Sequence, residues 1–248
     1  NTSVFFILRL IKTYMKIILT ACLAAISPFT FAQQVIDVDK MDRIPVNTFY
    51  SVGGEPVVTA RFIRVVEGTP FFQDRWLKGL VISDKDIRYQ NNRVKFNILD
   101  NQIHFLNEKG EEFSTAMAFK ELKLTDTVFG TTYRFLHSSA LPAFSSARKG
   151  LYLQLVEGDV SLYQEVTKTI REDKPYGSAV TEQKIVNTEE YYLVQKGTAV
   201  SVKRPKDIPG LLAGKKNELE AFLKNDSMRK ASHADMMKAL VSYYNTLK

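Results

Sequence analysis

The sequence predicts an α+β fold that is mainly β, with about ten antiparallel strands in a barrel or sandwich, followed by a C-terminal helical pair. Two patterns predict this fold. Between residues 57 and 203, apolar residues recur at every second position in short runs that turn residues separate, as in strands with one buried face. After Arg204-Pro205 the apolar spacing becomes three, four or seven residues, which is typical of amphipathic helices.

The first strands are expected to form a meander. Runs at 58–66 and 77–82 are separated by the turn sequence at 67–70. Val94, Phe96 and Ile98 then alternate with polar residues, and Ile103 and Phe105 resume the alternation after Asp100-Asn101. Asn and Asp tolerate the left-handed backbone that tight turns need, so these runs predict neighbouring antiparallel strands.

The second half continues with longer strands. The runs at 151–155, 160–170, 180–186, 191–195 and 199–203 are separated by turn sequences, among them Glu157-Gly158-Asp159 and Lys196-Gly197. No rhythm of strand, long helix and strand occurs, so the sequence does not favour a parallel sheet.

Two helices are expected over residues 204–248, packed on the β-domain. Leu219, Phe222 and Leu223 mark the buried stripe of the first helix. Ser232 with Asp235 resembles a capping box at the start of the second helix. The apolar residues that follow, including two methionines, mark a second stripe and are interpreted as core.

Residues 15–32 have the order of a secretory signal peptide. Met15-Lys16 gives a minimal basic start, residues 17–26 are apolar, Ser27-Pro28 breaks the run, and Ala32 is a small residue before Gln33. This order predicts export to the periplasm or the medium, with cleavage after Ala32.

The N-terminal region leaves two alternatives open. Residues 1–14 are apolar and basic, and we interpret them as an over-extended start before the true start at Met15, rather than as part of a longer signal or a membrane anchor. Cys22 ends a sequence that resembles a lipobox, so lipidation at Cys22, which would make an outer-membrane lipoprotein, is the minority interpretation. Apolar residues after Cys22 weigh against it.

The expected organisation is a signal region (1–32), a lead-in with the β-domain (33–203) and the helical pair (204–248). Removing the signal region lowers the formal net charge from +7 to +4, because it carries three basic residues and no acidic one. The remaining charges are mixed and no arginine cluster occurs, which argues against a nucleic-acid partner. Without Cys22 the chain has no cysteine, so no disulfide is expected.

No residue pattern predicts catalysis, a metal or a cofactor. The three histidines lack the close spacing of metal ligands. His104 lies between Ile103 and Phe105 in a strand and is expected to face solvent, and His233 lies beside a helix cap. His137 is the one in a loop with serines, but no Gly-x-Ser-x-Gly sequence accompanies it.

Three carboxylate pairs are candidates for the two acidic groups of a glycosidase. They are Glu111-Glu112, Glu189-Glu190 and the nearby Asp84 and Asp86. Adjacent residues in a strand point to opposite faces, so the Glu-Glu pairs are not expected to act on one bond. All three pairs are interpreted as turn or solvent residues.

Aromatic residues are the remaining candidates for binding. Phe71, Phe72 and Trp76 crowd one short connection, and an exposed aromatic cluster can stack on sugars or anchor a partner. We favour the other interpretation, in which these rings form a plug that closes one end of the β-core. Tyr176, in a Pro- and Gly-containing turn, is a weaker candidate of the same kind.

The chain resembles a group of exported proteins of Gram-negative bacteria. The resemblance lies in residues 68–72 followed by 76–79, in residues 94–98 leading to 103–105, and in the ending Tyr243-Tyr244-Asn245, and it covers most of residues 60–248. The group has no established activity, so the resemblance implies an exported β-rich protein and transfers no site residue.

These observations predict a periplasmic or cell-envelope protein that acts by binding or assembly, with an envelope protein or a small hydrophobic ligand as partner and no membrane span after cleavage. One alternative is a hydrophobic-ligand carrier whose barrel cavity is lined by Phe96, Ile98, Phe105 and Leu153. The other is an envelope hydrolase with a dispersed site, in which His137 would need a nearby carboxylate and hydroxyl.

Overall fold

A computed structural model describes residues 35–37, 50–51, 63–115, 117–144, 150–173, 176, 181–212 and 214–247. The predictions for Met15, Cys22 and Ala32, and for residues 58–62 of the first expected strand, lie outside the described residues. The described residues between 35 and 247 belong to one compact unit. Among the described residues, no helix is both long and apolar enough to cross a bilayer.

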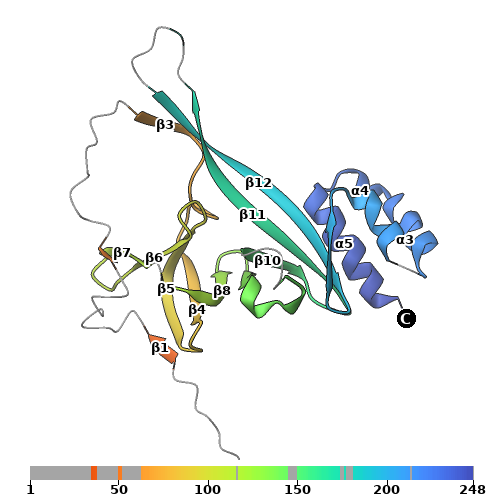
Figure 1. The fold of residues 1–248 in the computed structure, drawn as a ribbon, viewed down its shortest axis with the longest axis horizontal. Coiled ribbons are helices and arrows are strands. Elements are labelled where there is room, and N and C mark those ends of the chain that lie inside the picture. Colours follow the sequence, from red (N-terminus) through yellow and green to blue (C-terminus); the bar gives the residue numbers. More distant parts are fainter. Residues whose placement is uncertain are drawn as a thin grey trace, which may run out of the picture. The chain divides into compact units, whose positions relative to one another are not determined.

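Thirteen strands of the described residues form one sheet (Figure 1). The first seven are β1 (Val35–Asp37), β2 (Tyr50–Ser51), β3 (Ile63–Glu67), β4 (Leu77–Ser83), β5 (Arg88–Asn97), β6 (Gln102–Leu106) and β7 (Glu112–Thr115). The others are β8 (Phe119–Asp126), β9 (Thr131–His137), β10 (Leu151–Val156), β11 (Val160–Asp173), β12 (Thr181–Gln195) and β13 (Thr198–Val202).

The sheet is open. Its main path runs β13-β12-β11-β10-β9-β8-β4-β5-β6-β7-β2, and its two ends do not pair with each other. All pairs on this path are antiparallel, whereas β1 and β3 add parallel pairs to β5 and β12. The mainly β fold class with C-terminal helices is confirmed, and the barrel alternative is not realised because the path does not close.

The strands differ from the predicted runs in three places. The run expected at 58–66 does not begin the meander, because its described part, β3, pairs in parallel with β12 and not with β4. The runs expected at 180–186 and 191–195 are one continuous strand, β12. In addition, the sequence pattern did not predict β7, β8 or β9 as strands. In β8, Phe119 and Leu122 are both buried although they are three residues apart, because the register with β4 shifts at this point. Such a bulge hides the period-two pattern that identifies a strand.

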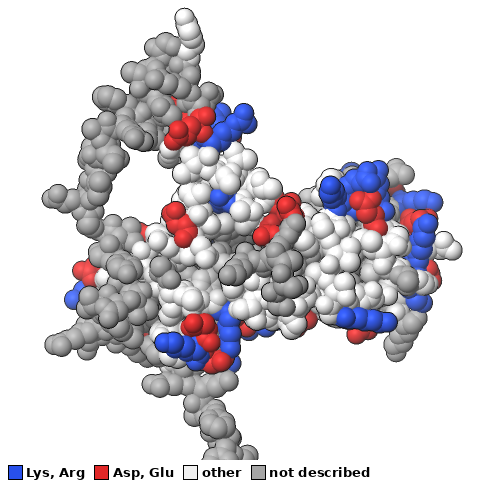
Figure 2. Space-filling model, viewed as in Figure 1, with Lys and Arg blue, Asp and Glu red and all other residues white. Residues whose placement is uncertain are grey.

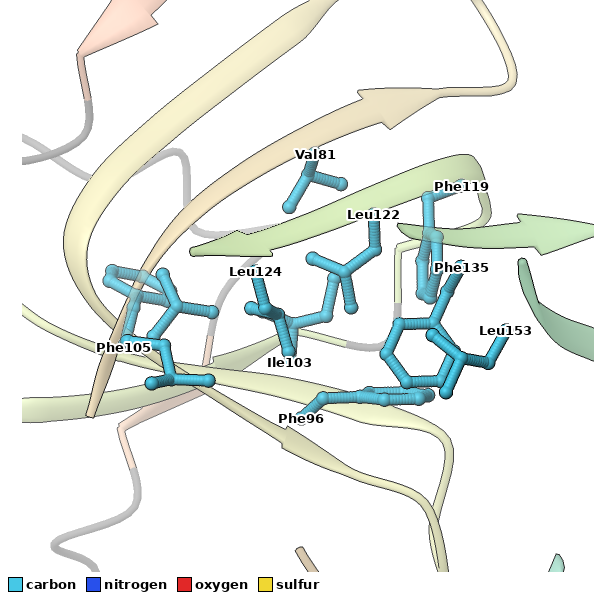
Figure 3. Packing of buried hydrophobic residues seen from close by; sticks show 11 residues of the cluster. Val81, Phe96, Ile103, Phe105, Phe119, Leu122, Leu124, Phe135 and Leu153 are labelled. Carbon is cyan, nitrogen blue, oxygen red and sulfur yellow. The ribbon is translucent and has the colours of Figure 1, made fainter. Parts of the chain in front are cut away.

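The strands β4 to β10 enclose the first hydrophobic core (Figure 3). Phe96 lies edge-on to Phe119 and Phe135, at ring-centroid distances of 6.1 and 5.2 Å. The residues proposed to line a carrier cavity, Phe96, Phe105 and Leu153, are buried in this core, and Ile98 packs against it. They therefore belong to the packed core of an open sheet and do not surround the interior of a closed barrel.

The β11–β12 hairpin holds two further cores on its opposite faces. Leu162 and Leu193 are paired and face the helices, whereas the paired Tyr163 and Tyr192 face the other way, toward Phe144. Each core is thus built from alternate residues of the same two strands.

The helical region comprises η4 (Pro205–Asp207), α2 (Ile208–Leu211), α3 (Lys216–Leu223), α4 (Asp226–Arg229) and α5 (His233–Thr246). The predicted cap is confirmed, because the Ser232 side chain accepts a hydrogen bond from the Asp235 N–H at 3.1 Å. The Phe222 ring of α3 stacks on the Tyr243 ring of α5, with 4.4 Å between the ring centroids. Leu219, Met237 and other helical side chains are buried against β11–β13.

Two hydrogen bonds of the Asn245 side chain link the end of α5 to the start of β11. Its side-chain amide accepts a hydrogen bond from the Val160 N–H at 3.0 Å and donates one to the Val160 carbonyl at 2.9 Å. A Cβ on Gly158 would lie 2.4 Å from the Asn245 Nδ2, so glycine leaves the space that this contact needs. The amide thereby satisfies both backbone groups of a fully buried residue.

We expect Asn245→Ala to lower the free energy of unfolding by about 1–3 kcal/mol, because it leaves the buried Val160 backbone groups without their partner. Urea unfolding followed by circular dichroism measures the change. Thr246→Ala, one residue along the same helix and exposed, is the matched control and should change stability by less than about 0.5 kcal/mol. Equal effects of the two substitutions would contradict the role of Asn245.

Candidate functional site

The segment from Gly68 to Trp76 crosses from β3 to β4 and brings together most of the predicted aromatic candidates. Gly68 has a φ of +85°, and a Cβ there would lie 2.5 Å from the Ile185 carbonyl oxygen of β12, so the crossing requires glycine. Beyond it, Phe72 N–H donates to the Phe96 carbonyl at 2.7 Å, and Ile98 N–H donates to the Pro70 carbonyl at 2.9 Å. These two hydrogen bonds attach the segment to the end of β5 and to the residue that follows it.

Phe71 and Phe72 point to opposite sides of this segment, as their adjacency suggests. Phe72 packs edge-on against Tyr133 and Phe135, at centroid distances of 5.0 and 4.9 Å, and joins the first core. This position fits the plug interpretation for Phe72.

Phe71 and Trp76 hold a lysine between them. Lys95 Nζ lies 5.0 Å from the Phe71 ring centroid and 4.9 Å from that of Trp76, and it forms an ion pair with Asp74 at 2.8 Å. These cation–π contacts engage both rings within the chain. Tyr176, by contrast, lies fully exposed between β11 and β12, away from this group in the sequence and not in contact with it in any described interaction.

The expectation that His104 faces solvent is wrong. His104 is buried, and the Phe71 ring covers it in a T-shaped contact with 5.2 Å between the ring centroids. Its Nδ1 lies 2.8 Å from Glu112 Oε1, and its Nε2 is buried without a hydrogen-bond partner among the described residues. Strand alternation places His104 on the outer face of the sheet, but only the tertiary position of Phe71 covers that face.

His137 is near a hydroxyl but not part of a triad. Its Nδ1 lies 2.8 Å from Ser139 Oγ and also accepts a hydrogen bond from the Ser139 N–H at 3.2 Å, as the cap of a short 3-10 helix. Among the described residues, no carboxylate forms an ion pair or hydrogen bond with this histidine. The arrangement orients a turn and lacks the carboxylate that a hydrolase would use to orient its base.

The Glu189-Glu190 pair is divided between the two faces of β12. Tyr191 Oη donates to Glu189 at 2.6 Å, and Tyr192 Oη donates to Glu190 at 2.6 Å. The prediction that these carboxylates point apart is confirmed. No group of three or more His, Cys, Asp or Glu side chains arranged for a metal ion occurs in the part of the chain that the structure describes.

No sequence pattern marks Lys168, which lies buried between β11 and the crossing segment, residues 68–76. Its side chain projects from β11 and is only 8% exposed, and its ammonium donates to the Thr69 and Phe71 carbonyls, both at 2.7 Å. Burial lowers the pKa of Lys168, and the negative charge of Asp74 offsets this only in part. Lys168 thus ties the crossing segment to the hairpin.

A cavity of about 400 Å³ lies against Lys168. It occupies the hairpin face that also carries the helices. Apolar side chains, including Phe72 and Leu153, line one part, and polar groups line the rest: Gln164, Lys168, Asn187, Glu189 and Lys238. An apolar wall with a few convergent polar groups is the usual composition of a small-molecule site.

The polar side of this cavity contains a connected chain of hydrogen bonds. Gln164 Nε2 donates to Tyr191 Oη at 3.2 Å, and Tyr191 Oη donates to Glu189 at 2.6 Å. Burial, together with the hydrogen bond to the Glu189 carboxylate, raises the pKa of Tyr191 well above its ordinary value. The phenol therefore remains a hydrogen-bond donor, and it holds Gln164 and Glu189 in place.

We expect Tyr191→Phe to lower the free energy of unfolding by about 1 kcal/mol at neutral pH, because two hydrogen bonds are lost. A raised folded-state pKa stabilises the fold below the ordinary value of 10.0 and loses this effect as the pH rises above it. The difference between wild type and Tyr191→Phe should thus be constant below that pH and shrink above it.

Urea unfolding across alkaline pH measures this difference, with Tyr176→Phe as the control at an exposed tyrosine. A difference that stays constant above the ordinary tyrosine pKa would refute the role assigned to the Tyr191 hydroxyl.

Comparison of the chain with protein-family models, with curated proteins and with solved structures found no match. The resemblance to exported proteins of Gram-negative bacteria therefore stays a prediction, and the function has to be argued from the site itself.

Proposed function

We propose that this chain is an exported, non-enzymatic binding protein of the periplasm or cell envelope, and that it binds a small amphipathic anion in the cavity beside Lys168. One observation carries the proposal: a buried ammonium at the wall of a partly apolar cavity. An ammonium group has three donors, and Lys168 directs two of them to backbone carbonyls.

The Lys168 ammonium supports an anionic group on the ligand; the Glu189 carboxylate in the same lining already accepts a hydrogen bond from the Tyr191 hydroxyl. Among the described residues, Lys168 forms no ion pair with a carboxylate. A buried charge is costly unless an opposite charge or hydrogen bonds compensate it, so an incoming carboxylate would gain the third donor and a counter-charge. Lys238 adds a second cation to the lining, and its ion pair with Asp235 at 3.3 Å lies near the start of α5.

The apolar part of the lining supports an alkyl chain or ring on the ligand. Phe72, Leu153, Leu155 and Val166 face the cavity, and about 400 Å³ is the space of a small organic molecule rather than of a peptide or nucleic acid. Charged side chains on the face shown in Figure 2 are mixed in sign, including over the region of α3 to α5. This mixture supports a small-molecule partner over a polyanion.

Isothermal titration with octanoate and with 1-octanol tests the proposal. The two probes share chain length and differ in charge, so we expect octanoate to bind more tightly by about tenfold or more, the effect of one charge-assisted hydrogen bond. Lys168→Met should abolish this preference. Lys123→Met, at a half-buried lysine that pairs with Glu121 at 3.2 Å, is the matched control and should retain it.

Binding of both probes with equal affinity would favour the hydrophobic-carrier alternative and contradict the role of the ammonium. Since Lys168 also ties the crossing segment, the fold of Lys168→Met is checked by circular dichroism. If this variant does not fold, Lys238→Met provides the second test, with a smaller but measurable loss of octanoate affinity expected.

A native mass spectrum of the protein isolated from its own envelope tests export and ligand together. We expect a chain that begins at Gln33 and carries an additional mass which leaves on denaturation. A lipidated chain that begins at Cys22 would instead establish the lipoprotein interpretation. A chain that retains residues 1–32 would contradict cleavage after Ala32.

A further inference from the structure

The turn between β8 and β9 displays two adjacent apolar side chains at its tip. Val128 is 81% exposed and Phe129 is 70% exposed. Among the residues that the structure describes, no other two consecutive large apolar residues are both exposed. Single exposed apolar residues are ordinary, but tight turns are usually polar. The pair therefore needs a reason other than the fold.

Buried groups hold this turn in one conformation. Asp126 is almost completely buried, and its Oδ1 accepts hydrogen bonds from the Val128 and Phe129 N–H groups, at 2.9 and 3.1 Å. Its other oxygen forms an ion pair with Arg75. Gly130, at a φ of +66°, completes the turn. Because Asp126 and Gly130 set the backbone, the turn itself does not need apolar side chains at 128 and 129.

Two basic residues, Arg75 and Lys78, lie near the base of the tip, where β8 ends at Asp126. The Arg75 guanidinium lies 5.0 Å from the Phe129 ring centroid and covers one face of the ring. Lys78 is exposed on β4 and pairs with Thr125, one residue before Asp126. Among the described residues, Asp126 is the carboxylate that pairs with Arg75, and no ion pair of Lys78 is described, so the base of the tip keeps a net positive charge.

We propose that the Val128–Phe129 tip inserts into a phospholipid surface and that Arg75 and Lys78 contact anionic headgroups. An apolar tip above a basic base matches the layers of a membrane interface, where apolar and aromatic side chains enter the hydrocarbon boundary and cations lie at headgroup level. The binding is peripheral and uses no spanning element.

The size of the tip favours a lipid surface over a protein partner. A stable protein interface buries about 800 Å² on each side, with an aromatic anchor surrounded by complementary neighbours. Here the anchor consists of two side chains on a projecting turn. A fluid surface adapts to such a tip, whereas a protein would need a surrounding contact area.

Fluorescence quenching tests insertion at the tip itself. Phe129→Trp is combined with Trp76→Phe, which removes the single native tryptophan. The full chain is mixed with vesicles of phosphatidylcholine and phosphatidylglycerol that carry bromine on the acyl chains. We expect the emission of this variant to be quenched. Tyr176→Trp with Trp76→Phe places the reporter at another fully exposed aromatic position and should not be quenched.

Vesicle partition of the unlabelled chain gives a second measure. Val128→Ser with Phe129→Ser should weaken partition by about tenfold or more without lowering thermal stability, because both side chains are exposed. This variant keeps Trp76, so the test stands even if Trp76→Phe does not fold. An unquenched tip, or unchanged partition, would overturn the proposal and point to a protein partner or to another part of the chain.

Discussion

The register of the β11–β12 hairpin is the constraint on which the rest of the structure depends. Its pairs run from Val160 with Gln195 to Asp173 with Glu182 without a shift. One face carries Leu162 and Leu193 toward the helices, and the opposite face carries Tyr163 and Tyr192 toward Phe144. A slip of one residue would exchange the two faces, which would expose both cores at once.

The same register also creates the polar centre. On the helix-facing side, Gln164, Lys168 and Glu189 follow the buried leucines at alternate positions, and Ala234 and Lys238 of α5 line the same cavity. The crossing segment then supplies the Thr69 and Phe71 carbonyls to Lys168. The same face of the hairpin therefore packs against the helices at Leu162 and Leu193 and forms a cavity wall a few residues further along. The buried Lys168 ammonium links this face to the segment that contacts the first core.

The parts of the structure that depend on local pattern were predictable, and the others were not. The meander of β4 to β6, the Ser232 cap and the divided Glu189-Glu190 pair follow from alternation and capping chemistry within short windows. The bulge in β8 concealed a strand, and the burial of His104 was missed because the covering residue, Phe71, lies more than thirty positions away in the sequence.

The candidate site shows the same division. From its sequence context Lys168 is one lysine among threonines in a strand, and no local signal marks it as buried. The sequence alone predicts the strands that alternate regularly, such as those of the β4 to β6 meander, and also the helical ending and the mixed charge, because these depend on residues within a few positions of each other. The tertiary structure was needed to show that the sheet stays open and that the crossing segment covers His104 and meets Lys168. Each of these depends on contacts between segments far apart in the chain, which periodicity does not encode.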